Sequence, residues 1–414
     1  MTPEPSALPD DLLAPDAVRD PDAAAAVLRA HDPVHWSAAH RAWLVSRYDD
    51  VVAAFRNPAL SSDRVRPVMS SSDAPSDDPT QRILGLMSEW MVVTDPPAHT
   101  RLRRLAGAAF RQQQIAAMED RIQALVDELV DAFVADGGAD LVAGVAYPLP
   151  ATVIAEMLGA PAADRDRFRA WSDELALVAF GAGGDARADR HERALRGLEE
   201  MVGYFRQLVA LRRREPGDDM LSAMLGDDQD GLSDDELVGM CALLLFAGHE
   251  TTTNAIANAI RLLTADPALR DRVRDDPALV NPAVEEALRL VGPIKVLVRW
   301  VVEDHELRGR TIRRGERVYL LLNGANRDPE RFPRPDAVDL ARERATHVAF
   351  GRGIHACIGA QLARIETRIA VGTLLRRLPG LRVAGEPAYL PTIASRAQES
   401  LPVVHDGSAV GSRP

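Results

Sequence analysis

Apolar residues recur at helical spacing along most of the chain between residues 100 and 378. The longest periodic segment follows Ser233, a favourable N-cap, and Glu236 three positions later completes a capping box. The pattern predicts helices over residues 100–110, 114–135, 149–158, 164–180, 188–213, 217–225, 233–264, 267–274, 280–291 and 358–378.

The remaining segments predict a minor β component. Alternation of apolar and polar residues predicts a hairpin over 34–45 and strands at 296–307 and 317–322, with a short helix at 48–55. Residues 59–82, rich in Ser, Asp and Pro, predict a long loop, and residues 1–20 a disordered segment. Because no repeat or linker divides the chain, we expect one domain over 21–414, mainly α with minor β (an α+β class).

Composition narrows the possible partners and location. Asp and Glu total 61 against 49 Lys and Arg, a net charge of −12, which disfavours nucleic acid as a partner. The N-terminus does not resemble a signal peptide, and the longest apolar run, 237–248, is too short to cross a bilayer. The two cysteines are far apart in the sequence and predict no disulfide framework. We therefore expect a cytoplasmic protein, monomeric and without a membrane partner.

The segment with the strongest chemical signal is FGRGIHACIG, residues 350–359, in which a Gly-rich turn delivers Cys357 to the start of a helix. Free N–H groups and partial positive charge at a helix N-terminus favour the thiolate and predict a lowered pKa for Cys357. Such a thiolate suits a nucleophile, a redox centre or a metal ligand. The alternative is a buried structural cysteine.

This segment resembles the haem-binding loop of cytochrome P450 enzymes, with Phe, Gly, His, Cys and Gly at the same spacing. The resemblance implies haem b held between the long central helix and the cysteine helix, with Cys357 as the thiolate ligand of iron. It implies that Phe350 packs beside the sulfur and that His355 binds a haem propionate. Three glycines are implied to let the backbone pass close to the porphyrin: Gly351, Gly353 and Gly359.

A second segment, AGHETT at 247–252, lies within the long helix and resembles the oxygen-binding kink of the same family. The resemblance implies that Gly248 makes room for dioxygen, that Thr251 hydrogen-bonds it, and that Glu250 relays protons from solvent. The alternative is an amphipathic helix that turns a polar face to water.

Three further matches concern support of the haem. Glu286 and Arg289, with Glu286 71 residues before Cys357, resemble the family's structural Glu-x-x-Arg pair, for which Arg334 is a candidate later partner. In isolation such a pair is usually a solvated ion pair. The remaining matches imply that basic side chains neutralise the propionates: His99 and Arg103, four residues apart on one helix face, together with Arg299.

The resemblance extends from about residue 30 to 405 and implies a bacterial haem-thiolate monooxygenase that uses O2 and takes electrons from a ferredoxin and its reductase. Docking of the ferredoxin is assigned to basic residues near the cysteine loop: Arg104, Arg111, Arg352 and Arg364. The alternatives are a peroxygenase, an oxidase that desaturates or couples its substrate, and a non-catalytic haem binder. The intact Glu250–Thr251 pair disfavours the peroxygenase.

The substrate is expected to be a hydrophobic small molecule of secondary metabolism, and the positions implied to line its pocket are mostly apolar. These positions are Met91, Val92, Leu244, Ala247, Ile294, Lys295, Leu297 and Ile393. Lys295, the only lysine of the chain, stands apart. It is expected either to extend its ammonium group to solvent or to pair with an anionic or carbonyl group of the substrate.

Overall fold

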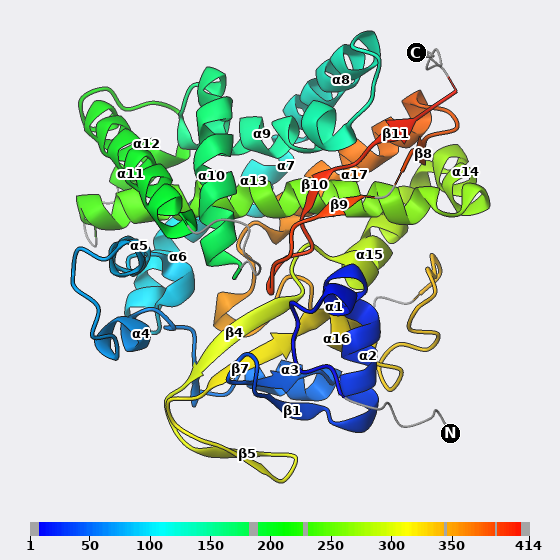
Figure 1. Ribbon diagram of the computed structural model, residues 1–414. Coiled ribbons are helices and arrows are strands. Elements are labelled where there is room, and N and C mark those ends of the chain that lie inside the picture. Colours follow the sequence, from blue (N-terminus) through cyan, green and yellow to red (C-terminus); the bar gives the residue numbers. More distant parts are fainter. Residues whose placement is uncertain (1–7, 182–188, 227–230, 343–345, 386, 407–414) are drawn as a thin grey trace.

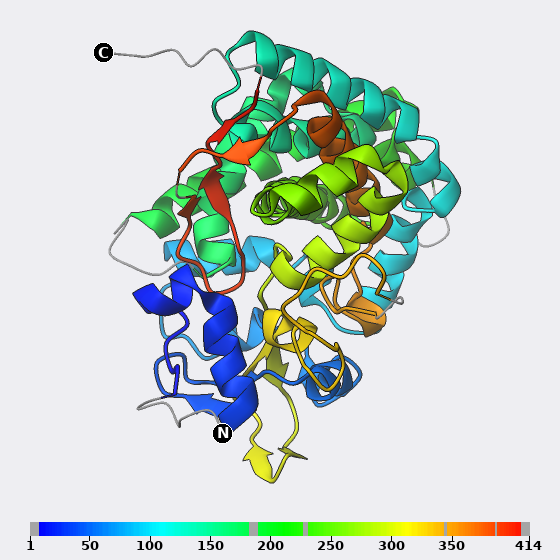
Figure 2. The ribbon, with the colours of Figure 1, turned by 90° about the vertical axis from the view of Figure 1, so that its right-hand side faces the viewer.

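A computed structural model of the chain describes residues 8–181, 189–226, 231–342, 346–385 and 387–406. Figures 1 and 2 show a helical part above a smaller part that holds the main sheet and the N-terminal helices. The α-helices are α1 (Pro15–Arg19), α2 (Pro21–His31), α3 (Tyr48–Ala54), α4 (Arg66–Ser70), α5 (Pro79–Met87), α6 (Ala98–Ala109), α7 (Gln112–Ala116), α8 (Glu119–Ala135), α9 (Pro148–Leu158), α10 (Arg165–Ala179), α11 (Arg190–Arg214), α12 (Met220–Leu225), α13 (Asp234–Thr264), α14 (Pro267–Asp275), α15 (Val280–Val291), α16 (Leu322–Asn326) and α17 (Ala360–Arg377).

Single-turn elements join several of these helices. They are 3-10 turns at η1 (Met91–Val93), η3 (Ala162–Asp164), η4 (Pro277–Leu279) and η5 (Gly353–His355), and a π-helical turn at η2 (Val142–Ala146). The strands are β1 (Val34–Ser37), β2 (Ala42–Val45), β3 (Leu60–Ser61), β4 (Val296–Val301), β5 (His305–Leu307), β6 (Arg310–Ile312), β7 (Arg317–Leu321), β8 (Arg382–Val383), β9 (Ala388–Tyr389), β10 (Gln398–Ser400) and β11 (Val403–Val404).

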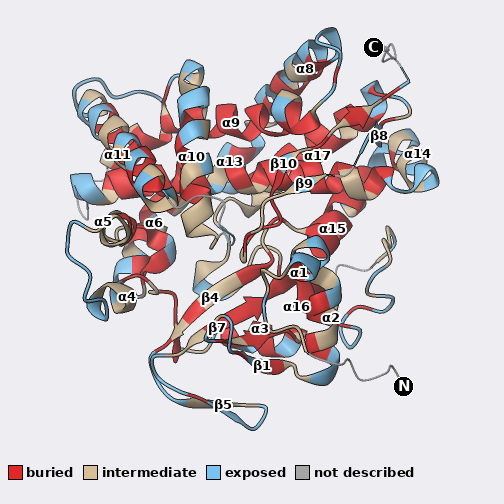
Figure 3. Ribbon diagram, in the orientation of Figure 1, coloured by how far each residue is buried: buried red, intermediate tan, exposed pale blue. Residues whose placement is uncertain are grey.

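Helix α13 is the centre of the helical part. The predicted capping box is confirmed: the Glu236 N–H donates to the Ser233 hydroxyl over 3.2 Å, and the Ser233 N–H donates to the Glu236 carboxylate over 2.9 Å. The helix packs against α9, α11, α15 and α17, and large apolar clusters lie around it. Figure 3 shows buried residues along most of its length, whereas the β5–β6 hairpin is mainly exposed.

The main sheet has the strand order β1-β2-β7-β4-β3, in which β2 and β7 are parallel and the other pairs antiparallel. The predicted hairpin is confirmed, with Val34 opposite Val45. The strand predicted over 296–307 divides into β4 and β5. Leu297 and Arg299 lie opposite Leu320 and Val318, so the sheet holds both side chains in a fixed register.

Two sequence predictions about irregular segments are wrong. Residues 59–82 contain β3, α4 and the start of α5, whose N-cap Asp78 accepts hydrogen bonds from the N–H groups of Thr80 and Gln81. Within the segment predicted to be disordered, residues 8–20 are described and include α1, while residues 1–7 lie outside the described residues. The Asp10 carboxylate accepts from two N–H groups of the β1–β2 turn, so the N-terminal segment packs on the hairpin.

The fold class is confirmed as mainly α with minor β. The expected domain over 21–414 stays a prediction, and its last residues, 407–414, lie outside the described part. Helix α2, which the periodicity did not predict, begins directly after Asp20. The Asp20 side chain accepts a hydrogen bond from the Ala23 N–H and caps the helix.

Candidate active site

The cysteine loop lies immediately before α17. The Cys357 N–H donates to the Phe350 carbonyl over 2.9 Å, which closes the loop on itself. Gly351 and Gly353 have φ angles of 64° and 73°, and a Cβ at Gly353 would lie 2.8 Å from the Phe55 carbonyl oxygen. These two positions therefore require glycine for their backbone conformation and packing within the protein itself.

Gly359 is different, because its φ is −86° and a Cβ there would meet only the Phe110 ring at 3.7 Å. Protein contacts alone do not require this glycine. Its implied approach to the porphyrin stays a prediction.

Cys357 is accessible, but the surrounding protein raises the pKa of its thiol. A hydrogen bond from the Gly359 backbone and the charges of Arg103 and Arg364 act in the opposite direction without reversing the shift. The lowered pKa predicted from the helix N-terminus is therefore not found for this thiol without a bound metal, because the loss of water outweighs the backbone hydrogen bond and the two arginine charges. A metal ion bound at the sulfur would act in the opposite direction and favour the thiolate.

The four predicted propionate-binding side chains come together from three elements. His99 and Arg103 lie on α6, Arg299 on β4, and His355 in the cysteine loop, with the two imidazole rings 4.0 Å apart. Both ring nitrogens of buried His99 and Nε2 of His355 have no hydrogen-bond partner among the described residues. Burial and the neighbouring positive charges lower the pKa of His355 to about 3 and that of Arg299 to about 10.

Arg64 is a further cation of this site that the sequence did not predict. Its charge lowers the pKa of both Arg299 and His355, so it lies close to them. The strand β3 places it there: Ser61 pairs with Trp300, and the Ser61 hydroxyl donates to Asp95, whose carboxylate is 4.0 Å from His355 Nε2. No sequence signal marked Arg64, because the segment around it was predicted to be a loop.

The charges fit a group that carries two carboxylates. The guanidinium groups of Arg64, Arg103 and Arg299 give this site an excess of positive charge over the neighbouring carboxylates of Asp95 and Asp63. A haem brings two propionates, and buried polar atoms without partners are the donors and acceptors that such groups would satisfy. The described residues contain no group of three or more His, Cys, Asp or Glu that could hold a metal ion. A metal at Cys357 would therefore have to bring its other ligands, as haem iron does.

The Glu286–Arg289 pair is buried, so the interpretation as a solvated ion pair is wrong. Arg289 Nε and Nη2 donate to the two carboxylate oxygens of Glu286, each over 2.8 Å. The later partner is Arg342, whose Nε is 3.1 Å from Glu286 Oε1, and the prediction of Arg334 is wrong. Arg334 pairs instead with Asp339 at the surface, because the chain turns through a positive φ at Arg334.

One face of α13 is accessible in the middle of the helix. Between residues 237 and 260 every residue is buried except Ala247, Gly248 and Thr251, whose spacing places them on one face. The Thr251 hydroxyl donates to the Ala247 carbonyl over 2.8 Å. A Cβ at Gly248 would lie 3.2 Å from Ile154 of α9, so helix packing gives this glycine a reason that is separate from dioxygen.

Glu250 points away from that face and is buried. Removal of water raises its pKa to about 7, the charge of Asp173 adds to the shift, and a 3.1 Å hydrogen bond from Asn254 opposes it. A carboxyl group with a pKa near 7 exchanges protons at neutral pH. Its electrostatic neighbours, Asp173 and Arg169, belong to α10 and are partly exposed, so they lie toward solvent.

The predicted substrate positions fall into separate clusters. Met91 and Leu244 are buried in one apolar cluster with Phe180 packed against it, and Val92 beside them is exposed. Ile294 and Leu297 are half-buried in a cluster around the main sheet. Ala247 supplies the accessible face of α13. The last predicted position is on the C-terminal turn, where the Ile393 N–H donates to the Gly181 carbonyl over 3.2 Å, at the end of α10.

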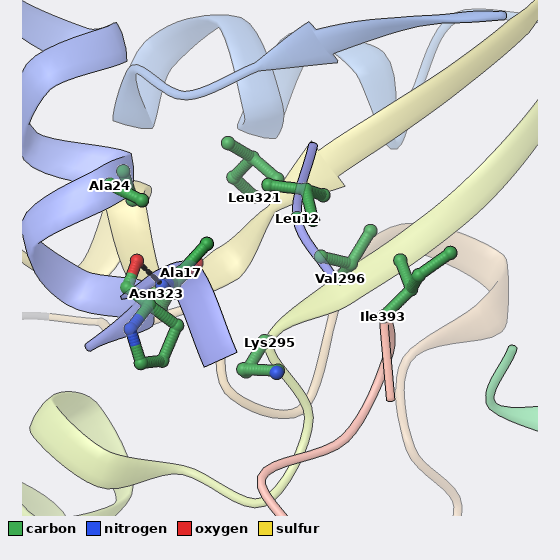
Figure 4. A pocket seen from close by; sticks show the side chains of 10 residues that line it. Leu12, Ala17, Ala24, Lys295, Val296, Leu321, Asn323 and Ile393 are labelled. Carbon is green, nitrogen blue, oxygen red and sulfur yellow. Dashed lines mark hydrogen bonds between the residues drawn. The ribbon is translucent and has the colours of Figure 1, made fainter. Parts of the chain in front are cut away.

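The ammonium group of Lys295 does not reach solvent. Its Nζ donates to the Thr392 carbonyl over 2.9 Å, and the residue is 6% exposed. Figure 4 shows it at the edge of a cavity of about 10 Å3, room for about one water molecule, lined mostly by apolar residues of α1, α2 and β4. The expectation of an ammonium group in solvent is wrong, because the N-terminal segment covers this side of β4.

Replacing Lys295 with methionine is expected to change how stability depends on pH. Burial, together with the charge of Arg396, lowers the pKa of Lys295 from 10.5 to about 8. The unfolded chain therefore binds more protons between those pH values, so stability rises with pH there, by about 3 kcal/mol in all. Denaturant unfolding between pH 7 and 10 should show that the free energy of unfolding of the variant exceeds that of the wild type by the largest margin at pH 7. Parallel profiles for the two proteins would contradict this.

Comparisons with known proteins agree with the geometry. A model of the family described as "Cytochrome P450" matches residues 189–379. The chain is 39% identical to the cytochrome P450 monooxygenase PikC of Streptomyces venezuelae, over 97% of this chain and 95% of PikC. It is 40% identical to a vitamin D(3) 25-hydroxylase of Pseudonocardia autotrophica, over 95% and 96% of the two chains.

A solved structure extends this likeness to the fold. The crystal structure of P450BioI in complex with a fatty acid ligated to acyl carrier protein matches with a TM-score of 0.87 and 32% identity. The match covers 94% of this chain and 100% of the other. Among the described residues, no helix is both long and apolar enough to cross a membrane.

Proposed function

The chain belongs to the cytochrome P450 family of haem-dependent monooxygenases that use O2, and we propose that it hydroxylates or epoxidises a hydrophobic small molecule of secondary metabolism. The observation that carries the proposal is the accessible face of α13, where Ala247 and Thr251 interrupt an otherwise buried helix. Relatives named for oxygen insertion, such as the mycinamicin IV hydroxylase/epoxidase of Micromonospora griseorubida, support this choice of reaction.

When bound, the haem supplies reductive activation of dioxygen through its thiolate-ligated iron. The protein would hold the haem through Cys357 on one side and through the cation cluster of Arg64, His99, Arg103, Arg299 and His355 at the carboxylates. Buried Arg299 and His99 are fixed by β4 and α6, so the haem would enter a preformed set of donors. Apolar side chains from η1, α13 and β4 would exclude water and orient the substrate.

We assign the delivery of protons from solvent to Glu250 and Thr251. The Glu250 carboxyl takes protons from the solvent side, near Asp173, and its pKa near 7 lets it release them at neutral pH. The Thr251 hydroxyl on the accessible face is the donor nearest to the substrate side, and it now donates its hydrogen bond to the Ala247 carbonyl oxygen. Rotation of this hydroxyl would redirect the proton without unfolding the helix.

Replacing Thr251 with alanine is expected to uncouple electron use from product formation. The hydroxyl that places a proton on the accessible face is lost, so product per electron pair should fall about 10- to 100-fold while hydrogen peroxide rises. The measurement is product and peroxide per reduced cofactor consumed. The matched control is Thr252→Ala, because the Thr252 hydroxyl donates to the Gly248 carbonyl on the buried side. Undiminished coupling in Thr251→Ala would argue against the assignment.

We propose a ferredoxin, with its reductase, as the electron donor. Arg104 and Arg111 are exposed beside the cysteine loop and support an acidic partner. Arg352 and Arg364 add positive charge in this region, although Arg352 also donates to the Tyr48 hydroxyl and the Thr346 carbonyl, and Arg364 pairs with Glu285. A rate of reduction that did not change with ionic strength would contradict this proposal.

The experiment that tests the proposed reaction is a screen of hydrophobic small molecules for a low-spin to high-spin shift of the haem, followed by turnover under 18O2. Insertion predicts one labelled oxygen atom in the product. A product that is desaturated or coupled, and carries no label, would favour the oxidase instead.

A further inference from the structure

A second ion-pair network, next to the Glu286–Arg289 pair, connects α15 to the cysteine loop. Arg364 of α17 donates to both carboxylate oxygens of Glu285, over 2.7 and 3.3 Å. His347 Nε2 is 3.1 Å from Glu285 Oε2. The Ala349 N–H donates to His347 Nδ1 over 3.2 Å, so the neutral imidazole carries its proton on Nε2 and donates it to Glu285.

This network ends at the residues that surround the cysteine sulfur. The Arg364 guanidinium lies 4.4 Å from the centre of the Phe350 ring, and the His347 ring lies 6.1 Å from the same ring. The Phe350 carbonyl in turn accepts the Cys357 N–H. The Arg364 guanidinium therefore places a positive charge beside the residue whose backbone holds Cys357. Glu285 is therefore placed to offset the positive charge that Arg364 brings near the Cys357 sulfur.

The Glu285 carboxylate keeps its charge throughout the neutral range. Burial alone would raise its pKa, but the hydrogen bonds from His347 and Arg364 outweigh burial and lower it to about 2. His347 is held by its two hydrogen bonds and is 6% exposed in its side chain, so the orientation of the carboxylate is set from both sides. The Glu285 carboxylate is thus held by two partners, one of which, His347, is buried.

We propose that Glu285 and Arg364 are positioning residues that set the reduction potential of the haem through Cys357, with Glu285 offsetting the charge that Arg364 places near the sulfur. The proposal rests on the haem-thiolate function proposed above. A positive charge near the thiolate draws electron density away from iron and favours the ferrous state, whereas a negative charge has the opposite effect. The two side chains together hold the potential between these limits.

Opposite shifts from the two single substitutions are the expected signature. Glu285→Gln leaves Arg364 without its counter-charge and should raise the potential, whereas Arg364→Gln leaves Glu285 alone and should lower it. At a fixed ambient potential, the ferrous-to-ferric ratio should change about three- to tenfold in each direction. The double substitution should return the potential close to the wild-type value. Spectroelectrochemical titration of the substrate-free holoenzyme measures all three.

The matched controls come from the same helix. Arg368, one turn beyond Arg364 on α17, donates to Glu119 over 2.7 Å, and both pairs are about one-third to two-fifths exposed. The Arg368–Glu119 pair connects α17 to α8 and not to the cysteine loop. Glu119→Gln and Arg368→Gln should therefore leave the potential unchanged while removing a comparable ion pair.

Each result bears on the proposal directly. Shifts in the same direction for both single variants, or shifts no larger than those of the controls, would overturn it and point to a loss of loop packing. Ferrous–CO spectra verify that each variant retains the thiolate. His347→Gln keeps a hydrogen-bond donor toward Glu285, so it tests the potential without removing either charge. Because the potential is read without substrate, failure here is distinguishable from failure of the proposed oxygen insertion.

Discussion

Replacing Arg289 with leucine is expected to lower the free energy of unfolding by about 3–5 kcal/mol and to weaken retention of haem. Arg289 is 1% exposed and donates to the Glu286 carboxylate and to the carbonyl oxygens of Asn326, Pro335 and Ala337. Leucine fills part of the volume but leaves a buried carboxylate and three carbonyl groups without this donor. Denaturant unfolding of the apo and holo proteins gives the size of the effect.

Arg334→Leu is the control for the Arg289→Leu experiment. Arg334 was the partner suggested by sequence, but its side chain is 73% exposed and pairs with Asp339. Arg334→Leu should change stability by no more than about 0.5 kcal/mol. Arg342→Leu should fall between the two, because Arg342 shares the Glu286 carboxylate. Equal losses for Arg289 and Arg334 would contradict the assignment of the buried network.

Replacing Cys357 with alanine is expected to abolish product formation and the red-shifted Soret band of the ferrous–CO complex. Cys357 is the accessible thiol, and the described residues provide no metal-binding cluster of three or more side chains that could replace it. The variant should still fold, because Cys357 contributes its backbone N–H, rather than its side chain, to the loop hydrogen bond with Phe350. Far-ultraviolet circular dichroism and the CO spectrum separate folding from ligation.

The other cysteine is the natural control. Cys241 is fully buried in α13, and burial raises its pKa to about 12, so it stays a neutral thiol. Cys241→Ala should keep the red-shifted band and the activity, at a small cost in stability from lost packing. If Cys357→Ala kept the band, the thiolate assignment would be wrong.

Several elements were predictable because their causes are local. The capping box at Ser233 and the apolar periodicity after it predicted α13, observed as Asp234–Thr264. The cysteine loop was recognisable because its glycines, Cys357 and His355 are adjacent in the sequence. Helix α2 and the start of α5 were missed although Asp20 and Asp78 cap them, because their Pro-rich surroundings suggested loops.

The sequence by itself determined the helical fold class and the enzyme class and marked Cys357 as the candidate ligand, since these depend on residue type and short spacing. Only the tertiary structure decided which distant charges meet. The pairing of β3 with β4 places Arg64 near the cations that are proposed to bind the propionates. The partner of Glu286 is Arg342 rather than Arg334, and the N-terminal segment covers Lys295. Such contacts join residues tens to hundreds of positions apart, and no local pattern encodes the packing that places them together.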